Sequence, residues 1–379
     1  MTEFSLTLHR AIAEIPAAEW DGLAGGGNPF VGHGFLSALE ESGSASARTG
    51  WLPQHAVLRD DAGRIVGCAP AYAKSHSYGE YVFDHGWAQA FERAGGNYYP
   101  KLQVAVPFSP VPGPRLLGEI PAEVFATALR QATGEIGFSS CHVTFCTEAE
   151  AQGLEDAGWL RRMGVQFHWS NAGFGSFDDF LGTMRASKRK SIRRERRDAQ
   201  TAGLVFRALQ GSAITPRHWR VFNRCYQNTV DRKWGSAYLT ETFWPLLADR
   251  LGDRVVLMVA EKDGEPVAAA LNLWGDDALY GRNWGTLVEA PFLHFELCYY
   301  QAIDFAIAHG IARVEAGAQG QHKIQRGYLP VATHSAHWIE HRGLRSAIAD
   351  FLARERAAMA AEMMVLAEGS PFRRAGEES

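Results

Sequence analysis

Apolar and polar positions follow two periods along the chain, one typical of strands and one typical of helices. In the second half they predict a strand at 278–284, a helix at 293–309 and a second strand at 312–316. A polar segment rich in Gly, Gln, His, Lys and Arg follows, as far as Tyr328. A parallel strand pair joined by a helix opens a crevice at the carboxyl ends of its strands, where ligands bind. We therefore expect the functional site at this crevice.

A similar local pattern occurs in the first half of the chain. Alternating apolar positions predict a hairpin at 55–72, with a turn ending at Gly63, and another at 255–274, with a turn ending at Gly264. An aromatic-rich strand is predicted after each hairpin, the first of them at 78–87. We interpret this similarity as an internal duplication of an α/β unit. The alternative is coincidence, because hairpins with turns of Asp and Gly are common.

The remaining segments complete an α/β fold with mixed sheets flanked by helices. Strands are predicted at 4–9 and 142–146, helices at 17–23, 35–41, 121–136 and 344–367, and an extended proline-rich segment at 100–114. At 379 residues the chain exceeds the usual length of a single core. We predict a first domain at 1–170, a basic linker helix at 171–203, and a second domain with the C-terminal packing helix at 204–379.

The overall charge limits the classes of partner. The net charge is −4, with 21% charged and 46% hydrophobic residues, so the whole protein suits neither DNA nor a membrane surface. The five cysteines lack Cys-x-x-Cys spacing and indicate reduced thiols, not a disulfide framework or metal site. No apolar stretch approaches the length of a membrane span, and no signal peptide is recognisable. We expect a cytoplasmic protein with no membrane insertion and no bound metal.

One basic segment departs from this acidic balance. Seven of the ten residues from Lys188 to Arg197 are basic, and Gly203 ends the helix that this segment predicts. Such a density of cations suits a diphosphate, a nucleotide-linked carrier or an RNA backbone. The alternative is a solvated helix surface, although Glu195 is the only acid inside the run. The candidate anion-binding residues are Arg185, Lys188, Lys190, Arg193, Arg194 and Arg197.

Acid–base groups gather around the predicted crevice. His294 and Glu296 lie at the start of the central helix, and Glu315 and Lys323 flank the polar loop after the last strand. Transfer of an acyl group to an amine needs a base for the ammonium and donors for the oxyanion. His294, Glu296 or Glu315 is the candidate base, and Lys323, Arg326 or a backbone N–H is the candidate oxyanion donor. The other candidate binding residues are Arg282, Trp284, Tyr300, Gln319, His322, Arg326 and Tyr328.

Several catalytic motifs are absent from the sequence. There is no Gly-x-Ser-x-Gly elbow, no phosphate-binding Gly-x-x-x-x-Gly-Lys-Ser/Thr loop, no His-Glu-x-x-His and no dinucleotide-binding glycine fingerprint. These absences argue against a hydrolase triad, a P-loop nucleotidase and a zinc enzyme. For each acid–base candidate alone, a capping or structural role is the alternative, so the crowding of these groups in one loop carries the interpretation.

Four segments together resemble the FemAB-like branch of the GNAT acyltransferase superfamily, and in particular N-acyltransferases labelled as peptidoglycan biosynthesis proteins. They are 108–115, the basic run from Lys188, His294-Phe-Glu-Leu-Cys-Tyr-Tyr-Gln301 and Glu315-Ala-Gly-Ala-Gln-Gly-Gln-His-Lys323. The resemblance covers nearly the whole chain and implies two tandem GNAT-like domains. It also implies an aminoacyl-tRNA as donor, and as acceptor the amine of a cell-wall peptide on a phosphate-bearing carrier.

The chain departs from the GNAT pattern where the pyrophosphate of CoA usually binds. In place of a glycine-rich loop it has Gly285-Thr-Leu-Val-Glu-Ala-Pro291, and the helical hairpin of some Fem proteins has no room here. The sequence predicts an N-acyltransferase that moves an acyl or aminoacyl group to an amine. A cell-wall precursor is the candidate acceptor, and acyl-CoA or aminoacyl-tRNA is the candidate donor. The alternatives are a CoA-dependent N-acetyltransferase of a small amine or protein, and a non-catalytic module that binds RNA or anionic carriers.

Overall fold

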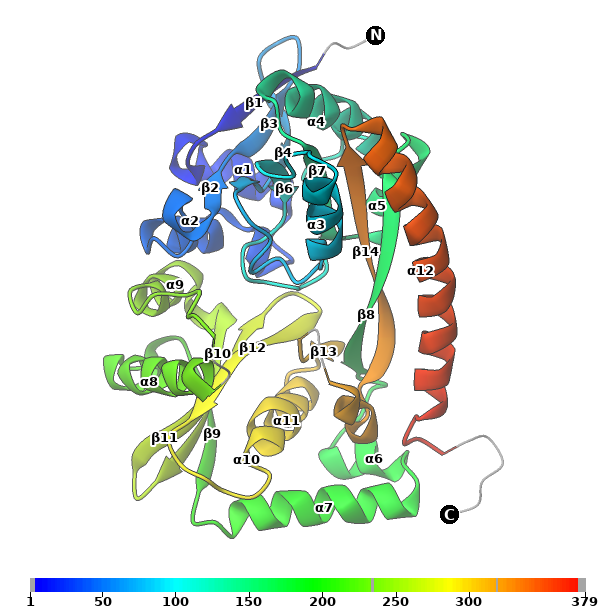
Figure 1. Ribbon diagram of the computed structural model, residues 1–379. Helices are drawn as coiled ribbons and strands as arrows, with labels where there is room; N and C mark the ends of the chain where they lie inside the picture. The colour runs from blue at the N-terminus through cyan, green and yellow to red at the C-terminus, as the bar shows by residue number, and fades with distance from the viewer. Residues whose placement is uncertain (1–3, 233–234, 318–319, 374–379) are drawn as a thin grey trace. The chain divides into compact units, whose positions relative to one another are not determined.

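Strands β8 (Leu160–Ser170) and β14 (Leu329–Ile339) each contribute residues to two compact units of the computed structural model (Figure 1). The structure describes residues 4–232, 235–317 and 320–373. Unit 1 contains the chain up to 165 with 238–243 and 332–361, and unit 2 contains 166–237, 244–331 and the chain from 362. The segment 332–361, which the sequence placed in the second domain, is thus grouped with unit 1.

Unit 1 begins with a strand and two helices and continues with antiparallel strands. Its helices are η1 (Ile12–Glu14), α1 (Ala17–Ala24), η2 (Pro29–Val31), α2 (His33–Glu41), η3 (Ala47–Thr49), α3 (His85–Arg93), α4 (Ala122–Ile136), α5 (Glu148–Asp156) and most of α12 (Arg342–Glu368). Its strands are β1 (Ser5–His9), β2 (Trp51–Pro53), β3 (His55–Arg59), β4 (Ile65–Ala69), β5 (Ala71–Lys74), β6 (Lys101–Val104) and β7 (Ser140–Cys146). The predicted hairpin at 55–72 is confirmed as β3, β4 and the start of β5.

The strands of unit 1 form two sheets that share one core. One sheet has the order β1-β3-β4, and the other contains the order β2-β5-β6-β7-β14, in which β6 and β7 run parallel. The predicted helix at 121–136 is confirmed as α4, and its Phe125 and Leu129 pack with Leu102, Val104 and Val143 of β6 and β7. This burial of the apolar stripe of α4 explains why its helical period is visible in the sequence.

The carboxyl end of β7 is covered by the proline-rich segment that follows β6. The Arg115 guanidinium is fully buried and donates hydrogen bonds to the carbonyl oxygens of Thr144 (3.0 Å), Gly113 (3.2 Å), Pro114 (3.1 Å) and Val111 (2.6 Å). Four carbonyl groups therefore satisfy a cation that would be costly to bury alone. In unit 1, the end of the parallel strand pair is filled by the chain itself.

The prediction of an aromatic-rich strand at 78–87 is wrong. Residues up to 84 form a loop, α3 begins at His85, and the third strand of the sheet is β6 instead. The loop turns at Gly79 (φ 80°) and Tyr81 (φ 60°), conformations that a strand excludes. Its alternation of aromatic and polar residues reflects buried acids, because Glu80 and Asp84 point into the interior.

A buried ionic network holds this loop. Lys101 Nζ donates to Ser77 Oγ (2.8 Å), Glu80 Oε2 (2.8 Å) and Asp84 Oδ2 (2.5 Å), and the ammonium is fully buried. Tyr98 O–H also donates to Asp84 Oδ2 (2.8 Å). Burial raises the pKa of Glu80 to about 7, and although burial acts on Asp84 in the same sense, the charge of Lys101 holds its pKa below the ordinary value. The loop is therefore fixed by charge, not by strand pairing.

Unit 2 repeats the order of elements found in unit 1. Its helices are α6 (Phe177–Gly182), α7 (Ala186–Gln200), η4 (Gly211–Ala213), α8 (Pro216–Arg232), α9 (Phe243–Leu251), η5 (Gly252–Arg254), α10 (Leu293–Phe295), the π-helical turn η6 (Glu296–Tyr300), α11 (Gln301–Ala308) and η7 (Gln321–Arg326). Its strands are β9 (Val205–Gln210), β10 (Val255–Lys262), β11 (Glu265–Trp274), β12 (Ala278–Thr286) and β13 (Arg313–Glu315), besides its part of β8. The second predicted hairpin, at 255–274, is confirmed as β10 and β11.

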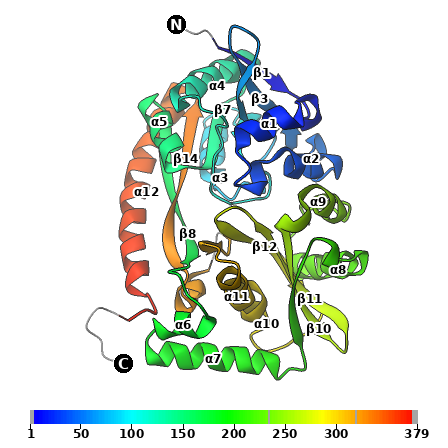
Figure 2. The ribbon, with the colours of Figure 1, turned by 180° about the vertical axis from the view of Figure 1, so that it is seen from behind.

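The two units share a parallel strand pair after an antiparallel meander. In unit 2 the strand order is β9-β10-β11-β12-β13-β8, and β12 runs parallel to β13 as β6 does to β7. Figures 1 and 2 show α8 and α11 on opposite sides of strands β9 to β12. This common order of strand, helices, meander, helix and parallel strand supports the predicted duplication. Among the described residues, no helix is long and apolar enough to cross a membrane.

Candidate functional site

Strands β12 and β13 separate at the predicted crevice. Their pairing ends at Tyr280 opposite Glu315, while β12 continues as far as Thr286, still paired with β11 but no longer with β13. Helix α8 packs closely on this free end, since a Cβ at Gly285 would lie 2.0 Å from the Cys225 carbonyl oxygen. The predicted strand–helix–strand unit is confirmed, and it opens where the sequence placed the site.

The central helix of this unit is interrupted by one π-helical turn. The turn η6 joins α10 to α11, and Phe292, just before α10, is held in the left-handed region (φ 55°). π-Helical turns and left-handed bulky residues are both uncommon and occur often at functional sites. The predicted helix at 293–309 is thus confirmed in position, with an irregular first half that the sequence pattern did not show.

Glu296 lies in the π turn and faces α7. It is fully buried, and its Oε1 accepts hydrogen bonds from Arg196 Nη2 (3.0 Å) and Gln301 Nε2 (2.7 Å). Burial raises the pKa of this carboxyl, against the opposing charge of Arg196. No described residue donates a hydrogen bond to Oε2. The ion pair between Glu296 and Arg196 therefore links the central helix to α7.

Glu315 ends β13 inside the crevice. Arg313 Nε donates to Glu315 Oε1 (2.9 Å), whereas Oε2 accepts no hydrogen bond from any described residue and lies 3.7 Å from His168 Nε2. Burial raises the pKa of Glu315 to about 7, and burial lowers the pKa of His168 to about 4. The charge of Arg282 also acts on Glu315, in the opposite sense to burial. The result is a buried carboxyl with a raised pKa and with one oxygen that accepts no hydrogen bond from a described residue.

Lys323 lies on the other side of the polar loop. Its side chain is buried, and Nζ donates to the Gly317 carbonyl oxygen (2.8 Å). Burial lowers the pKa of Lys323 to about 8, and its charge acts on the imidazoles of His168 and His322. Lys323 thus lies within electrostatic range of both sides of the crevice. The predicted binding residue Gln319 lies outside the described residues.

An aromatic and imidazole cluster occupies the start of the central helix. The ring centroids of Trp284 and His294 are 4.4 Å apart, and that of His294 is 5.3 Å from Tyr299 and 6.2 Å from His322. His322 Nε2 and Tyr299 O–H are hydrogen-bonded (2.9 Å). Burial, with the charges of Arg326 and Lys323, lowers the pKa of His322 and favours its neutral form. Four side chains from β12, the central helix and η7 therefore meet at one place.

This cluster adjoins a hollow of about 330 Å³ at the free end of β12. Its lining is mostly apolar, and a cationic side chain, Arg232, and a carboxylate, Glu289, belong to it as well. The lining residues are Arg232, Trp284, Thr286, Val288, Glu289, Ala290, Phe292, Leu293, His294 and Phe295. An apolar hollow with a few polar groups is the usual form of a small-molecule site.

Arg326, Tyr300 and Tyr328 lie in the interior beside the π turn. Arg326 Nη2 donates to both carboxylate oxygens of Glu195 (3.1 and 3.0 Å), and Tyr300 O–H donates to the same carboxylate. Arg326 Nη1 donates to the His322 carbonyl oxygen (2.9 Å). Tyr328 is fully buried, and its O–H donates to the Tyr299 carbonyl oxygen (3.4 Å). These three predicted binding residues therefore make internal contacts, which connect the π turn and η7 to their neighbours.

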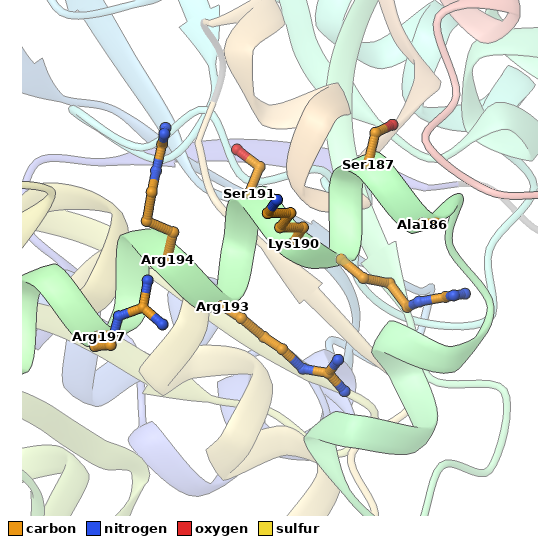
Figure 3. Close-up of a pocket in the computed structure, with 8 residues that line it drawn as sticks. Ala186, Ser187, Lys190, Ser191, Arg193, Arg194 and Arg197 are labelled. Atoms are coloured by element: carbon orange, nitrogen blue, oxygen red, sulfur yellow. The ribbon is translucent and has the colours of Figure 1, made fainter.

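The basic run is helical as predicted, but its helix, α7, is shorter than the predicted linker at 171–203, which also contains α6. Most of the cations of α7 are exposed, and Arg196 points inward. A hollow of about 530 Å³ runs along it, lined by Ala186, Ser187, Arg189, Lys190, Ser191, Arg193, Arg194 and Arg197. Figure 3 shows Arg193 and Arg194 extending to different sides of the helix. Arg193 pairs with Asp178 (2.8 Å), and no described acid pairs with Lys190, Arg194 or Arg197. The exposed side of α7 therefore carries cations that a polyanion can neutralise.

The first turn of this helix is different. Arg185 immediately precedes α7, and its guanidinium donates to the Ser370 carbonyl oxygen, which ties it to the C-terminal segment. Lys188 is half-buried. The six predicted anion-binding residues are therefore not equivalent, and the accessible cations among them are concentrated from Lys190 to Arg197.

Four contributors to the site were not among the predicted residues. His168 comes from β8, and no sequence signal placed it beside Glu315. Tyr299 and Arg196 lie within segments already singled out, but their inward direction follows from the π turn and from the buried side of α7. Glu195 had a signal, since it is the single acid in the basic run. No cluster of His, Cys, Asp and Glu that could hold a metal is found among the described residues.

Solved structures show what class of fold this is. The C-terminal domain of a proposed lysylphosphatidylglycerol synthetase from Agrobacterium fabrum matches with a TM-score of 0.51 and 13% identity, over 84% of this chain and 96% of that chain. A conserved protein of unknown function from Bacteroides thetaiotaomicron matches with a TM-score of 0.52 and 11% identity, over 89% and 100% of the two chains. The FemX crystal structure is similar at a TM-score of 0.49 and 11% identity, over 81% and 92%. The fold is the expected α/β fold of tandem GNAT-like domains.

The sequence itself identifies the family. It matches the FemAB-like family, described as peptidoglycan biosynthesis/recognition, over residues 11–374, and the chain belongs to this family. The resemblance seen in the sequence is thereby confirmed. No curated protein matches the sequence significantly.

Proposed function

We propose that this protein transfers an acyl or aminoacyl group to the amine of a phosphate-bearing cell-wall precursor. The observation that carries the proposal is the buried Glu315 carboxyl, which has one oxygen without a described hydrogen-bond donor and a pKa raised by burial to about 7. A base with a pKa near the working pH is the form that general-base catalysis requires. Membership of the FemAB-like family supports a role with peptidoglycan precursors.

The proposed reaction begins with removal of a proton from the acceptor. Glu315 Oε2 takes a proton from the acceptor ammonium, and the neutral amine then attacks the carbonyl carbon of the donor. Of the three candidate bases, Glu315 is favoured because it lies where β12 and β13 separate, whereas Glu296 faces α7 and His294 lines the apolar hollow. The bond from the carbonyl carbon to the leaving oxygen or sulfur breaks as the amide forms, and the leaving group takes up a proton.

Lys323 is the proposed donor to the oxyanion that forms during this attack. An ammonium has three N–H donors, and one is directed at the Gly317 carbonyl oxygen in this structure. A buried positive charge stabilises a developing negative charge more strongly than one in water does. The hollow lined by Trp284 and His294 is the proposed seat of the acyl group, because its lining is mainly apolar.

The exposed cations of α7 are the proposed binding site for the phosphate groups of the donor or the acceptor. We expect Arg194→Gln/Arg197→Gln to weaken binding of such a ligand about tenfold and to flatten its salt dependence, because each lost phosphate contact removes about 0.7–0.9 from the logarithmic salt slope. Titrations with tRNA and with a nucleotide-linked precursor at several salt concentrations measure both quantities. Arg220→Gln/Arg224→Gln, which removes two exposed charges from α8, is the matched control. An equal loss in both double variants would refute a specific role for α7.

A transfer assay tests the proposed function itself. The purified protein is incubated with a nucleotide-linked cell-wall precursor and, separately, with acyl-CoA, aminoacyl-tRNA and uncharged tRNA, and the products are analysed by mass spectrometry. We expect the precursor to gain the mass of one acyl or aminoacyl group with one class of donor. Acylation of a small amine or protein by acyl-CoA, with no change in the precursor, would replace this proposal by the acetyltransferase alternative. Binding without turnover for every donor would support a non-catalytic module.

A further inference from the structure

Helix α7 has a second face, which is turned toward the candidate site. Its Ile192, Glu195 and Ala199 are buried, and Arg196 is mostly so. These residues follow helical spacing and alternate with the exposed cations Arg194 and Arg197. The outer face of α7 therefore carries the candidate phosphate-binding cations, and its inner face carries the charged residues that contact the candidate site.

The inward acid holds the segment that carries His322 and Lys323. Glu195 accepts two hydrogen bonds from Arg326, which is the last residue of η7, and one from Tyr300 of the π turn. Arg326 in turn donates to the carbonyl oxygen of His322 (2.9 Å). Because Glu195 and Arg326 are both buried, this pair is costly to break.

Arg196, the buried arginine of α7, contacts the π turn at its first residue. Arg196 Nη2 donates to Glu296 Oε1 (3.0 Å) and to Asp304 Oδ2 (2.6 Å), so it joins the first residue of the turn to α11. Its guanidinium also lies 4.3 Å from the ring centroid of Phe177. Glu195 and Arg196, adjacent in sequence, thus hold the π turn, which carries Glu296, and η7, which carries Lys323.

The outward face is under electrostatic stress. Lys190 and Arg194 are four residues apart, as are Arg193 and Arg197, and like charges at this spacing destabilise a helix. Asp178 offsets part of this repulsion at Arg193 only. A bound polyanion removes this repulsion and raises the local stability of α7. Segments that open together with the helix are then stabilised as well, without a large change of shape.

We propose that binding of a polyanion to the outer face of α7 orders the π turn and η7 through Glu195 and Arg196, which act as positioning residues. The inference rests on the proposed function, since it takes the α7 cations as a seat for phosphate groups. It adds a reason for their location: a helix that binds phosphate also holds the segments that carry Tyr299, His322 and Lys323. Occupancy by a phosphate-bearing substrate thereby assembles the site before transfer.

Hydrogen–deuterium exchange of the full chain tests this coupling. Inorganic tripolyphosphate is the probe, because it supplies only the charge and has no acyl group or peptide. In the wild type we expect exchange to slow in α7 and, by roughly fivefold, in 296–301 and 321–326. In Arg196→Gln we expect the slowing in α7 to remain while that in 296–301 is lost. Asp304→Asn removes one of the two carboxylate contacts of Arg196, and we expect a smaller loss in the same segment.

The controls separate this inference from a general loss of stability. Arg196→Lys restores a cation and is expected to recover part of the coupling, and Arg194→Gln/Arg197→Gln is expected to abolish the response in all three segments. Slowing confined to α7 in the wild type, or a full response in Arg196→Gln, would overturn the inference while the transfer assay still decides the proposed function. If tripolyphosphate does not slow exchange in α7 at all, both the inference and the proposed phosphate-binding role of α7 are contradicted. If the wild type shows the full exchange response but transfers no group in the transfer assay, only the proposed function is contradicted.

Discussion

Glu315→Gln is expected to reduce transfer by about 10²- to 10⁴-fold. Glutamine has the shape of glutamate but accepts no proton from the ammonium of the acceptor. The hydrogen bond from Arg313 Nε to Oε1 is retained by the amide oxygen, so the site keeps its geometry. Steady-state kinetics should show the loss mainly in kcat. A loss below tenfold would remove Glu315 as the base and return attention to His294.

The pH dependence gives an independent check of the same residue. Burial raises the pKa of Glu315 to about 7, so the active carboxylate is lost as the pH falls below that value. We expect kcat/KM to fall by about a factor of ten per pH unit below 7, and to fall again above about 8, where Lys323 loses the proton that it donates to the oxyanion. For stability the sign is opposite, because a raised carboxyl pKa stabilises the folded state at low pH and this contribution is lost as the pH rises from about 4.5 to about 7.

A matched pair of variants separates catalysis from folding. Glu315→Gln removes the buried charge, so above pH 7 the variant is expected to be at least as stable as the wild type. Glu241→Gln changes an exposed carboxylate in the same way and is expected to leave both activity and stability unchanged. Thermal denaturation at pH 8 measures the stability of all three proteins. A large fall in Tm for Glu315→Gln would mean that its loss of activity reports unfolding.

Lys101→Met is expected to lower the free energy of unfolding by about 3–5 kcal/mol. The substitution keeps the apolar stem but leaves Glu80 and Asp84 buried without their shared ammonium. Burying a carboxylate without a partner costs far more than exposing it. Denaturant unfolding followed by tryptophan fluorescence is the appropriate measurement, since Trp51 and Trp87 lie buried in unit 1.

The size of this effect depends on removing one side of the network only. Glu80→Gln/Asp84→Asn/Lys101→Met removes Lys101 together with its two carboxylate partners, and we expect it to recover a substantial part of the lost stability. Buried Lys74, which lies 3.9 Å from Glu80, keeps its hydrogen bond to the Tyr78 carbonyl oxygen. Lys262→Met, an exposed lysine at the end of β10, is the control and should cost less than about 0.5 kcal/mol. If Lys101→Met and Lys262→Met were equally mild, the network would contribute little to the stability of unit 1.

The parts of the fold predicted well are those where one face of an element is buried. Both hairpins, α4 and the strand–helix–strand unit were predicted because apolar residues repeat at the spacing that packing imposes. Helix α7 was predicted from its run of basic residues and from Gly203, which ends it. The segment 78–87 was misassigned for a physical reason. Its polar positions are buried and charged, so its alternation resembles that of a half-exposed strand.

The candidate site was predicted in part, and the rest depends on tertiary structure. Glu315 and Lys323 were found because they flank a loop at the carboxyl end of a strand. His168 was missed because strand pairing between β8 and β13, distant in sequence, brings it to Glu315. The roles of Glu195 and Arg196 were missed because helical spacing shows that two residues differ in direction, but not which direction is inward.

Arg115 gives the duplication an asymmetry. In unit 1 its guanidinium bonds to four carbonyl groups and closes the end of the parallel strand pair, whereas the strands of unit 2 separate around Glu315. The arginine side chain of unit 1 thus fills the space that an open crevice would leave to a ligand. A ligand could enter unit 1 at this edge only by displacing a buried guanidinium from its four carbonyl acceptors, and the broken hydrogen bonds would oppose its binding.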